Sequence, residues 1–192
     1  MTAAAPAPVS DGRIRCPWSE GSQLYRDYHD HEWGRRLHGD DAMFERMCLE
    51  AFQSGLAWIT ILRKRPAFRI AFAGFSIERV AEFGDADVDR LLADTGIVRN
   101  RAKIESAIAN ARVAAGLRSG LDELIWSFAP PSRPRPRSTA EVPATSPESI
   151  ALAKELKKRG FRFVGPTTAY ALMQAVGMVD DHLSDCWVPS DR

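Results

Sequence analysis

A seven-residue segment, YHDHEWG from Tyr28 to Gly34, combines two histidines, two acidic residues, a tyrosine and a tryptophan. Histidine binds metal ions and transfers protons near neutral pH, carboxylates accept protons or oppose a positive charge, and aromatic rings stack on flat ligands. This concentration of side chains is compatible with three interpretations. The segment forms a metal site, an acid–base site, or a crowded turn on the surface.

Four potential metal ligands lie near the two ends of the sequence. Cys16 and His29 are separated by 12 residues, whereas His182 and Cys186 have a spacing that places both side chains on one helical face or across one turn. Two cysteines and two histidines form a tetrahedral zinc set, and four protein ligands favour a structural over a catalytic metal. No zinc-finger pattern has this separation, so two unrelated cysteines and two surface histidines are the alternative.

Glu50 is a second candidate for chemistry. On a helical projection it falls beside Met43, Met47 and Ser54, at the edge of the apolar face, where a carboxylate would be half-buried. The alternative is an exposed ion pair with Arg46, four residues earlier, which contributes about a few tenths of a kcal/mol. The spacing alone favours the exposed pair. Four aromatic residues lie near Glu50 or the candidate ligands, and they belong either to the core or to a slot for a flat ring: Trp18, Tyr28, Trp33 and Trp58.

Helices must position these side chains, because the sequence shows helical periodicity and no recurring alternation of a strand. Caps and glycine stops predict an all-α fold with eight or nine helices. Asp40 or Asp41 is expected to cap the helix that carries Glu50, and Pro66 to begin a new helix. The predicted helices cover about residues 40–53, 56–64, a segment starting at 66, 76–83, 85–94, 99–116, 121–128, 146–160 and 165–177.

The last two predicted helices are joined by a short turn between Gly160 and Gly165. Gly160 can adopt the positive φ that ends a helix, and the free amides at the start of the next helix can bind phosphate. Four basic residues near the turn would add long-range attraction to DNA: Lys157, Lys158, Arg159 and Arg162. An ordinary helical hairpin explains the same pattern.

The 192-residue sequence predicts one helical domain at residues 13–192 behind a disordered tail at residues 1–12. Residues 129–147 contain six of the 12 prolines and are expected to form a long loop. The formal net charge is only +1, so no overall field indicates a nucleic-acid partner. Three cysteines, no apolar leader and no long apolar run predict a soluble cytoplasmic protein that has no membrane partner.

Four ordered segments together resemble DNA-3-methyladenine glycosylase I, a family of helix-hairpin-helix repair enzymes. They are RCPWS with LYRDYHDHEWG, MFERMCLEAFQSGLAWITILRKR, GIVRNRAKIESAIANA, and LKKRGFRFVGPTTAYALMQAVGMVDDH with a following cysteine. The resemblance extends from about Cys16 to Cys186. It implies a helix-hairpin-helix glycosylase fold whose terminal segments are joined by a zinc clasp. The implied activity is base-excision repair, in which a monomeric enzyme flips and hydrolytically releases 3-methyladenine from alkylated double-stranded DNA.

The resemblance also implies roles for individual residues. One structural Zn²⁺ per chain would be bound by Cys16, His29, His182 and Cys186. The catalytic residues would be Glu50 and Tyr28. The base pocket would be lined by Tyr28, Glu50, Trp58, Trp18 and Trp33. DNA contacts would come from Gly55, Leu56, Gly160, Gly165 and Thr167. Asp180 and Asp181 follow the hairpin, and their role is left open.

Two other functions are compatible with parts of this pattern. The first is a zinc-stabilised, non-catalytic helix-hairpin-helix protein that only binds DNA, although such a protein would not need the set of Tyr28, Glu50 and Trp58. The second is a zinc hydrolase with Glu32 or Glu50 as its base. A metal with four protein ligands argues against the hydrolase, because no coordination position is left for water.

Overall fold

The computed structural model describes residues 11–190, and within them the chain is all-α, as predicted, with no strand. The predicted tail at residues 1–12 lies outside the described residues except for its last two positions. The α-helices are α1 (Gln23–His31), α2 (Asp40–Gln53), α3 (Trp58–Ala71), α4 (Ile77–Ala81), α5 (Asp85–Ala93), α6 (Arg101–Ala115), α7 (Gly120–Trp126), α8 (Pro147–Lys158) and α9 (Pro166–Ala175). Short 3₁₀ helices are η1 (Pro17–Gly21), η2 (Ala73–Phe75) and η3 (Thr139–Glu141).

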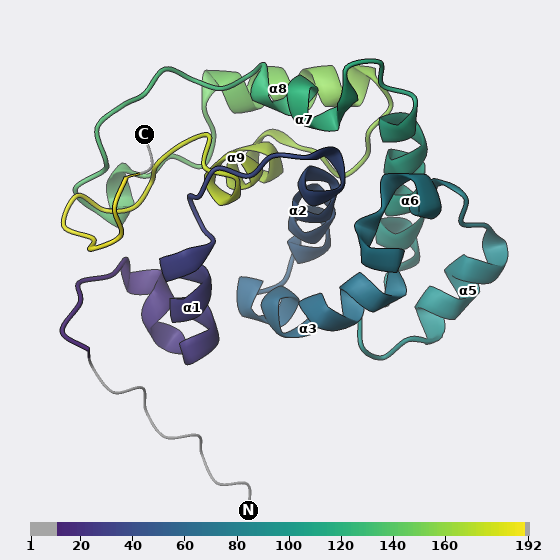
Figure 1. The fold of residues 1–192 in the computed structure, drawn as a ribbon, viewed down its shortest axis with the longest axis horizontal. Coiled ribbons are helices and arrows are strands. Elements are labelled where there is room, and N and C mark those ends of the chain that lie inside the picture. Colours follow the sequence, from purple (N-terminus) through teal and green to yellow (C-terminus); the bar gives the residue numbers. More distant parts are fainter. Residues whose placement is uncertain (1–10, 191–192) are drawn as a thin grey trace, which may run out of the picture.

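Helix α2 forms the centre of the molecule, and Figure 1 shows the other helices around it. It packs against α3, α4, α6, α7 and α9. Apolar side chains on more than one side of α2 are fully buried, including Met43, Phe44, Leu49 and Phe52. Because neighbours surround this helix, a carboxylate near its C-terminal end is buried as well, and this places Glu50 inside the protein.

Two of the predicted helix boundaries are wrong. Pro66 does not begin a helix but lies inside α3, which continues to Ala71. A proline inside a helix removes one backbone hydrogen bond, but buried Ile61 and Phe68 anchor α3 to the core on both sides of it. The cap of α2 is Gly39 rather than Asp40 or Asp41. The carboxylates of those two aspartates instead accept backbone hydrogen bonds from Asp122 and Ile77.

Residues 23–31 form α1, a helix that the sequence pattern did not predict. Ser22 caps it by accepting from the amide of Tyr25 at 3.2 Å. Only its C-terminal part is buried, where Tyr28, His29 and Asp30 meet the rest of the protein. The polar composition that obscured the periodicity therefore belongs to the end of this helix that faces the candidate site.

Helices α8 and α9 pack against each other and are joined by a tight turn. Gly160 has a φ of +100°, as the sequence predicted, whereas Gly165 has an ordinary φ of −72°. Buried Asn110 of α6 fixes the turn, because its side chain donates to the carbonyl of Arg162 at 3.0 Å and accepts from its amide at 2.8 Å. The hairpin is thus held in place by α6.

Residues 129–146 contain no α-helix, and Pro147 is already the first residue of α8. Two arginines attach this segment to the end of the chain. Arg133 pairs with buried Asp181 at 2.6 Å, and Arg135 pairs with Asp180 at 2.9 Å. No helix within residues 11–190 has both the length and the apolar character that are needed to cross a membrane.

Candidate functional site

The four predicted metal ligands meet in one buried cluster. The ligand atoms of Cys16, His29, His182 and Cys186 all lie within 4.8 Å of one another. The Cys186 sulfur is 3.5 Å from both His29 Nε2 and His182 Nδ1, and these two nitrogens are 3.2 Å apart. Both histidines are almost completely buried, so the alternative of surface histidines is wrong.

Hydrogen bonds on the outer side of each ring determine which nitrogen faces the cluster. His29 Nδ1 donates to the carboxylate of Asp30 at 2.8 Å, and Arg15 holds that carboxylate through a second ion pair at 2.8 Å. His182 Nε2 donates to the backbone carbonyl of Trp33 at 3.1 Å. Neutral imidazole carries one proton, so the inner nitrogens of the two rings are both acceptors. Two acceptors at this distance repel each other, and a metal ion or a shared proton between them removes the repulsion.

The spacing of the ligand atoms fits a tetrahedral zinc. Zinc bound at its usual distances separates two nitrogens by about 3.3 Å and a sulfur from a nitrogen by about 3.6 Å. The corresponding separations here are 3.2 Å for the nitrogens, 3.5 Å from Cys186 to each of them, and 3.9 Å from Cys16 to His182 Nδ1. The amide of Leu183 also donates to the Cys16 sulfur at 3.3 Å, a backbone contact of the kind that orients a metal ligand.

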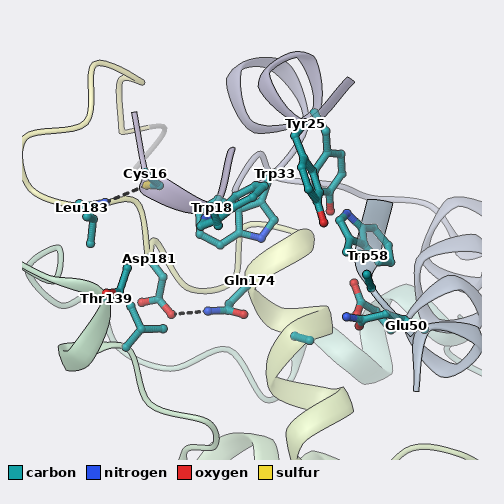
Figure 2. Close-up of a pocket in the computed structure, with 15 residues that line it drawn as sticks. Cys16, Trp18, Tyr25, Trp33, Glu50, Trp58, Thr139, Gln174, Asp181 and Leu183 are labelled. Atoms are coloured by element: carbon teal, nitrogen blue, oxygen red, sulfur yellow. Dashed lines mark hydrogen bonds between the residues drawn. The ribbon is translucent and has the colours of Figure 1, made fainter. Parts of the chain in front are cut away.

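A pocket of about 510 Å³ opens beside this cluster and brings together all five residues predicted to bind a base. They come from different elements: Trp18 from η1, Tyr28 from α1, Glu50 from α2, Trp58 from α3, and Trp33 from the segment after α1. Figure 2 shows Trp18 and Trp33 on one wall, with Trp58 and Glu50 on another. The metal cluster and the pocket share Cys16, so the two sites are continuous.

The aromatic rings of the pocket contact one another at an angle. The rings of Tyr28 and Trp58 have centroids 5.5 Å apart and planes inclined by 50°, and those of Trp18 and Trp33 meet edge to face at 5.1 Å. Two rings that enclose a flat base must be parallel and about 7 Å apart, twice the usual contact distance between carbon atoms. Neither of these two pairs can therefore enclose a base between its own two rings.

Glu50 is 6% exposed and forms no ion pair with Arg46, so the exposed pair considered from the sequence is wrong. Arg46 instead donates to Glu32 at 2.7 Å. Burial raises the pKa of Glu50 from 4.5 to about 8, and the positive charge of Arg46 reduces this shift only in part. Burial, and then the charge of Glu50, also raises the pKa of Tyr28. At neutral pH the carboxyl group in the empty pocket is therefore mainly protonated.

This shift predicts how stability depends on pH. The folded protein retains a proton on Glu50 that the unfolded chain loses above about pH 4.5, so the stability contributed by this group is complete below that pH and declines up to about pH 8. Relative to Glu50→Gln, which cannot ionise, the free energy of unfolding of the wild-type protein should fall by about 2 kcal/mol between pH 6 and pH 8. Urea denaturation of both proteins measures this difference. Parallel pH profiles would contradict the buried carboxyl.

Glu32, the other acid considered as a hydrolytic base, is already paired with two arginines. Arg65 binds both of its carboxylate oxygens at 2.7 Å, and Arg46 shares one of them. Burial alone would raise the pKa of Glu32, but the hydrogen bonds from Arg65 and Arg46 outweigh it and lower the pKa to about 2. A carboxylate this firmly paired is a poor proton acceptor, so the geometry gives no support to the zinc hydrolase.

Several pocket residues were not found by sequence reasoning. They are Tyr25, Gln53, Gln174, Asp181 and Leu183, together with Thr139 and Val142 of the proline-rich segment. Tyr25 and Leu183 are ordinary core-type residues in the sequence, and the segment at 129–146 carries no periodic signal. Only the folded chain brings them next to Glu50.

A second, shallower cavity of about 400 Å³ adjoins the first and contains three of the residues predicted to contact DNA, Gly55, Leu56 and Thr167. Glu50 and Gln53 line both cavities, so they connect the pocket to this face. Leu56, which lines this cavity, is 40% exposed and so is accessible to a partner. Gly160 and Gly165 lie at the two ends of the turn that precedes Thr167 and do not line either cavity.

Comparison with known proteins places the chain among glycosylases. The methyladenine glycosylase family matches residues 18–189. The DNA-3-methyladenine glycosylase of Haemophilus influenzae is 42% identical over 177 residues, covering 90% of this chain and 96% of the relative. A crystal structure of 3-methyladenine DNA glycosylase I has 43% identity and a TM-score of 0.87, covering 91% and 98% of the two chains. The Staphylococcus aureus enzyme, described for its recognition of 3-methyladenine, has 32% identity and a TM-score of 0.88, covering 93% and 98%.

Proposed function

The chain belongs to the methyladenine glycosylase family, and we propose on this basis that it acts in base-excision repair by releasing 3-methyladenine from alkylated double-stranded DNA. The observation that carries the proposal is the pocket that gathers Trp18, Tyr28, Trp33, Glu50 and Trp58. A protein that only held the DNA backbone would not need such a pocket. We propose that the enzyme acts as a monomer.

The chemistry suits these residue types. A base within the duplex must be flipped out before its glycosidic bond can be reached. Methylation at N3 gives adenine a positive charge, so the base leaves with the bonding electrons without strong acid catalysis. The sugar carbon is left with the positive charge, and water adds to it and loses one proton to the solvent. We infer that Tyr28 and Glu50 contact the reacting base and that one of the aromatic rings stacks on it.

Glu50 would change its protonation state during this cycle. In the empty pocket its pKa of about 8 keeps it mostly neutral. A cationic base beside it favours the carboxylate, so binding releases the proton and forms a charge-assisted hydrogen bond to the exocyclic amine. Unmodified adenine carries no charge and gains less from the same contact. The arrangement therefore favours damaged over normal bases.

The direct test is to incubate the purified protein with methylated DNA and to separate the released bases by chromatography. The proposal expects free 3-methyladenine. A folded protein that releases no base from this DNA would support the non-catalytic alternative instead. The Glu50→Gln variant serves as the control for contaminating glycosylases, because its activity should be strongly reduced.

We also propose that Cys16, His29, His182 and Cys186 hold one structural zinc ion. Bound there, the metal would neutralise two thiolates and join the segment before η1 to the end of the chain. Three observations support this proposal: the identity of the four ligands, the distances between their ligand atoms, and the two imidazole nitrogens that face each other as acceptors. All four positions around the ion are taken by the protein, so the metal would take no part in cleaving the base.

We infer that the turn between α8 and α9 and the face around Gly55, Leu56 and Thr167 contact the DNA. Gly165 offers a sharp test because a Cβ added there would meet no protein atom within 4 Å and its φ suits any residue. Gly165→Val should fold normally but weaken DNA binding about three- to tenfold through hindered approach to the backbone. Fluorescence anisotropy at several salt concentrations measures this change.

Gly84→Val is the matched control for this substitution. Gly84 also precedes a helix, α5, has a φ of −115°, and leaves open space for a Cβ. It should bind DNA like the wild-type protein. Equal affinity of the Gly165→Val variant and the wild-type protein at every salt concentration would remove the hairpin from the interface.

A further inference from the structure

Gln174 of α9 lines the base pocket, although no role has been assigned to it so far. Its side-chain Nε2 donates to Asp181 Oδ2 at 2.8 Å. Figure 2 shows the amide of Gln174 between Asp181 and Glu50 in this view, with the hydrogen bond to Asp181 dashed. Its backbone carbonyl accepts from the amide of Gly34 at 3.2 Å, so the main chain at this position is fixed too.

The surroundings of Asp181 determine which way the amide points. Asp181 is 3% exposed and accepts from Arg133 at 2.6 Å and from the hydroxyl of Tyr170 at 2.7 Å. A carboxylate paired with arginine offers only acceptors, so it must be met by the NH₂ group of Gln174 and not by its oxygen. The other end of the amide, Oε1, has no hydrogen-bond partner among residues 11–190 that would compete for it.

We propose that Gln174 determines specificity, with Asp181 orienting its amide so that Oε1 accepts from the exocyclic amine of 3-methyladenine and opposes the oxygen of 3-methylguanine. The inference rests on the proposed function and assigns a substrate preference to the same pocket. An adenine amine has two hydrogens, one for Glu50 and one for Gln174. Guanine has an acceptor oxygen at that position, which would face the acceptor Oε1 of Gln174.

Glu50 alone would discriminate poorly between these two bases. A carboxyl group that is neutral near pH 7 can donate to the guanine oxygen, and an ionised one can accept from the adenine amine. Gln174 lacks this freedom, because the hydrogen bond to Asp181 fixes its NH₂ end at that carboxylate and leaves Oε1 at the other end of the amide. Glu50 can donate or accept, whereas Oε1 of Gln174 can only accept. This difference explains how a pocket that contains an acid of variable protonation state can still distinguish an amine from an oxygen.

The test measures dissociation constants of the free bases 3-methyladenine and 3-methylguanine by NMR titration of the full protein. Gln174→Met keeps the length of the side chain but removes its acceptor. It should weaken binding of 3-methyladenine about three- to tenfold and leave binding of 3-methylguanine unchanged or tighter. Gln23→Met is the matched control, because Gln23 is an exposed glutamine on α1 that donates to Asp27 in the same way.

A second variant tests the orienting role of Asp181. In Asp181→Asn the new amide can donate to Oε1, which lets Gln174 turn its NH₂ group into the pocket, so the preference for 3-methyladenine should fall here as well. If this variant does not fold, the result for Gln174→Met alone tests the inference. Unchanged binding of 3-methyladenine in folded Gln174→Met, or an equal loss for both bases, would overturn the inference. Release of 3-methyladenine from methylated DNA by the wild-type protein tests the proposed function separately.

Discussion

Replacing Cys186 with serine is expected to remove the bound metal and to lower the stability of the protein in the same step. The remaining ligands would be a buried thiol and two imidazole nitrogens 3.2 Å apart that both present lone pairs. Without a metal, these two lone pairs face each other in a buried site, which is unfavourable. Together with the lost metal bonds, this should reduce the free energy of unfolding by on the order of 5 kcal/mol.

Metal analysis and denaturant unfolding, with and without a chelator, measure the two effects. Cys48→Ala is the matched control, because Cys48 is also buried but lies on α2 among core residues outside the cluster. It should keep its zinc and lose only packing energy. Wild-type protein that is purified without denaturation and contains no zinc would refute the clasp, as would a Cys186→Ser variant with unchanged metal content.

The proposed zinc should also affect the pocket, because it would join residues that line two of the pocket's walls. Cys16 and Leu183 line the pocket and are joined through the hydrogen bond from the Leu183 amide to the Cys16 sulfur. Trp18 and Trp33 pack against the histidine rings of the cluster. Partial removal of the metal should therefore loosen base binding before the core around α2 unfolds, since that core is formed by other helices.

The sequence allowed the all-α class and most of the helices to be predicted, because capping residues and apolar spacing act locally. Its failures have specific physical causes. Pro66 is tolerated inside α3 because tertiary packing outweighs one lost hydrogen bond. Helix α1 was missed because its buried end is polar, and His29 and Asp30 contact His182 and Trp187, which are more than 100 residues away.

Predicting the candidate site required more than periodicity. The spacing placed Glu50 at the edge of a helix face and favoured an exposed ion pair with Arg46. In the structure Arg46 donates instead to Glu32, the residue that follows α1. Gln174 gave no sequence signal that separates it from a helix surface, and the position of Asp181 after the hairpin left the role of that residue open. Their contact arises where the end of α9 meets the segment that Arg133 attaches.

Glu50→Gln is expected to reduce excision of 3-methyladenine from DNA by roughly ten- to over a hundredfold in kcat/KM. Glutamine resembles the neutral acid of the empty pocket, so the variant should fold well and even gain stability at higher pH. It cannot become a carboxylate when the cationic base enters. The loss corresponds to one charge-assisted hydrogen bond, about 1.5–3 kcal/mol.

Trp58→Ala should weaken the same step through lost stacking while leaving binding to undamaged DNA nearly unchanged. Trp58 lines the pocket but not the second cavity, which carries the expected DNA contacts. Stacking of a base on an aromatic ring contributes about 1–3 kcal/mol. Equal losses for damaged and undamaged DNA would assign Trp58 to the DNA surface instead of the base pocket.

The dependence of kcat/KM on pH distinguishes an effect of the charge of Glu50 from an effect of the shape of its side chain. If the carboxylate is the active form, kcat/KM of the wild-type enzyme should rise with pH up to about 8, the pKa of the free enzyme, and then level off. The cationic base itself does not titrate in this range, so the Glu50→Gln variant should show no such rise. The opposite result would be a wild-type kcat/KM that is constant from pH 6 to pH 9 and a Glu50→Gln variant that is equally active. Glu50 would then be a buried neutral acid that contributes only to the shape of the pocket.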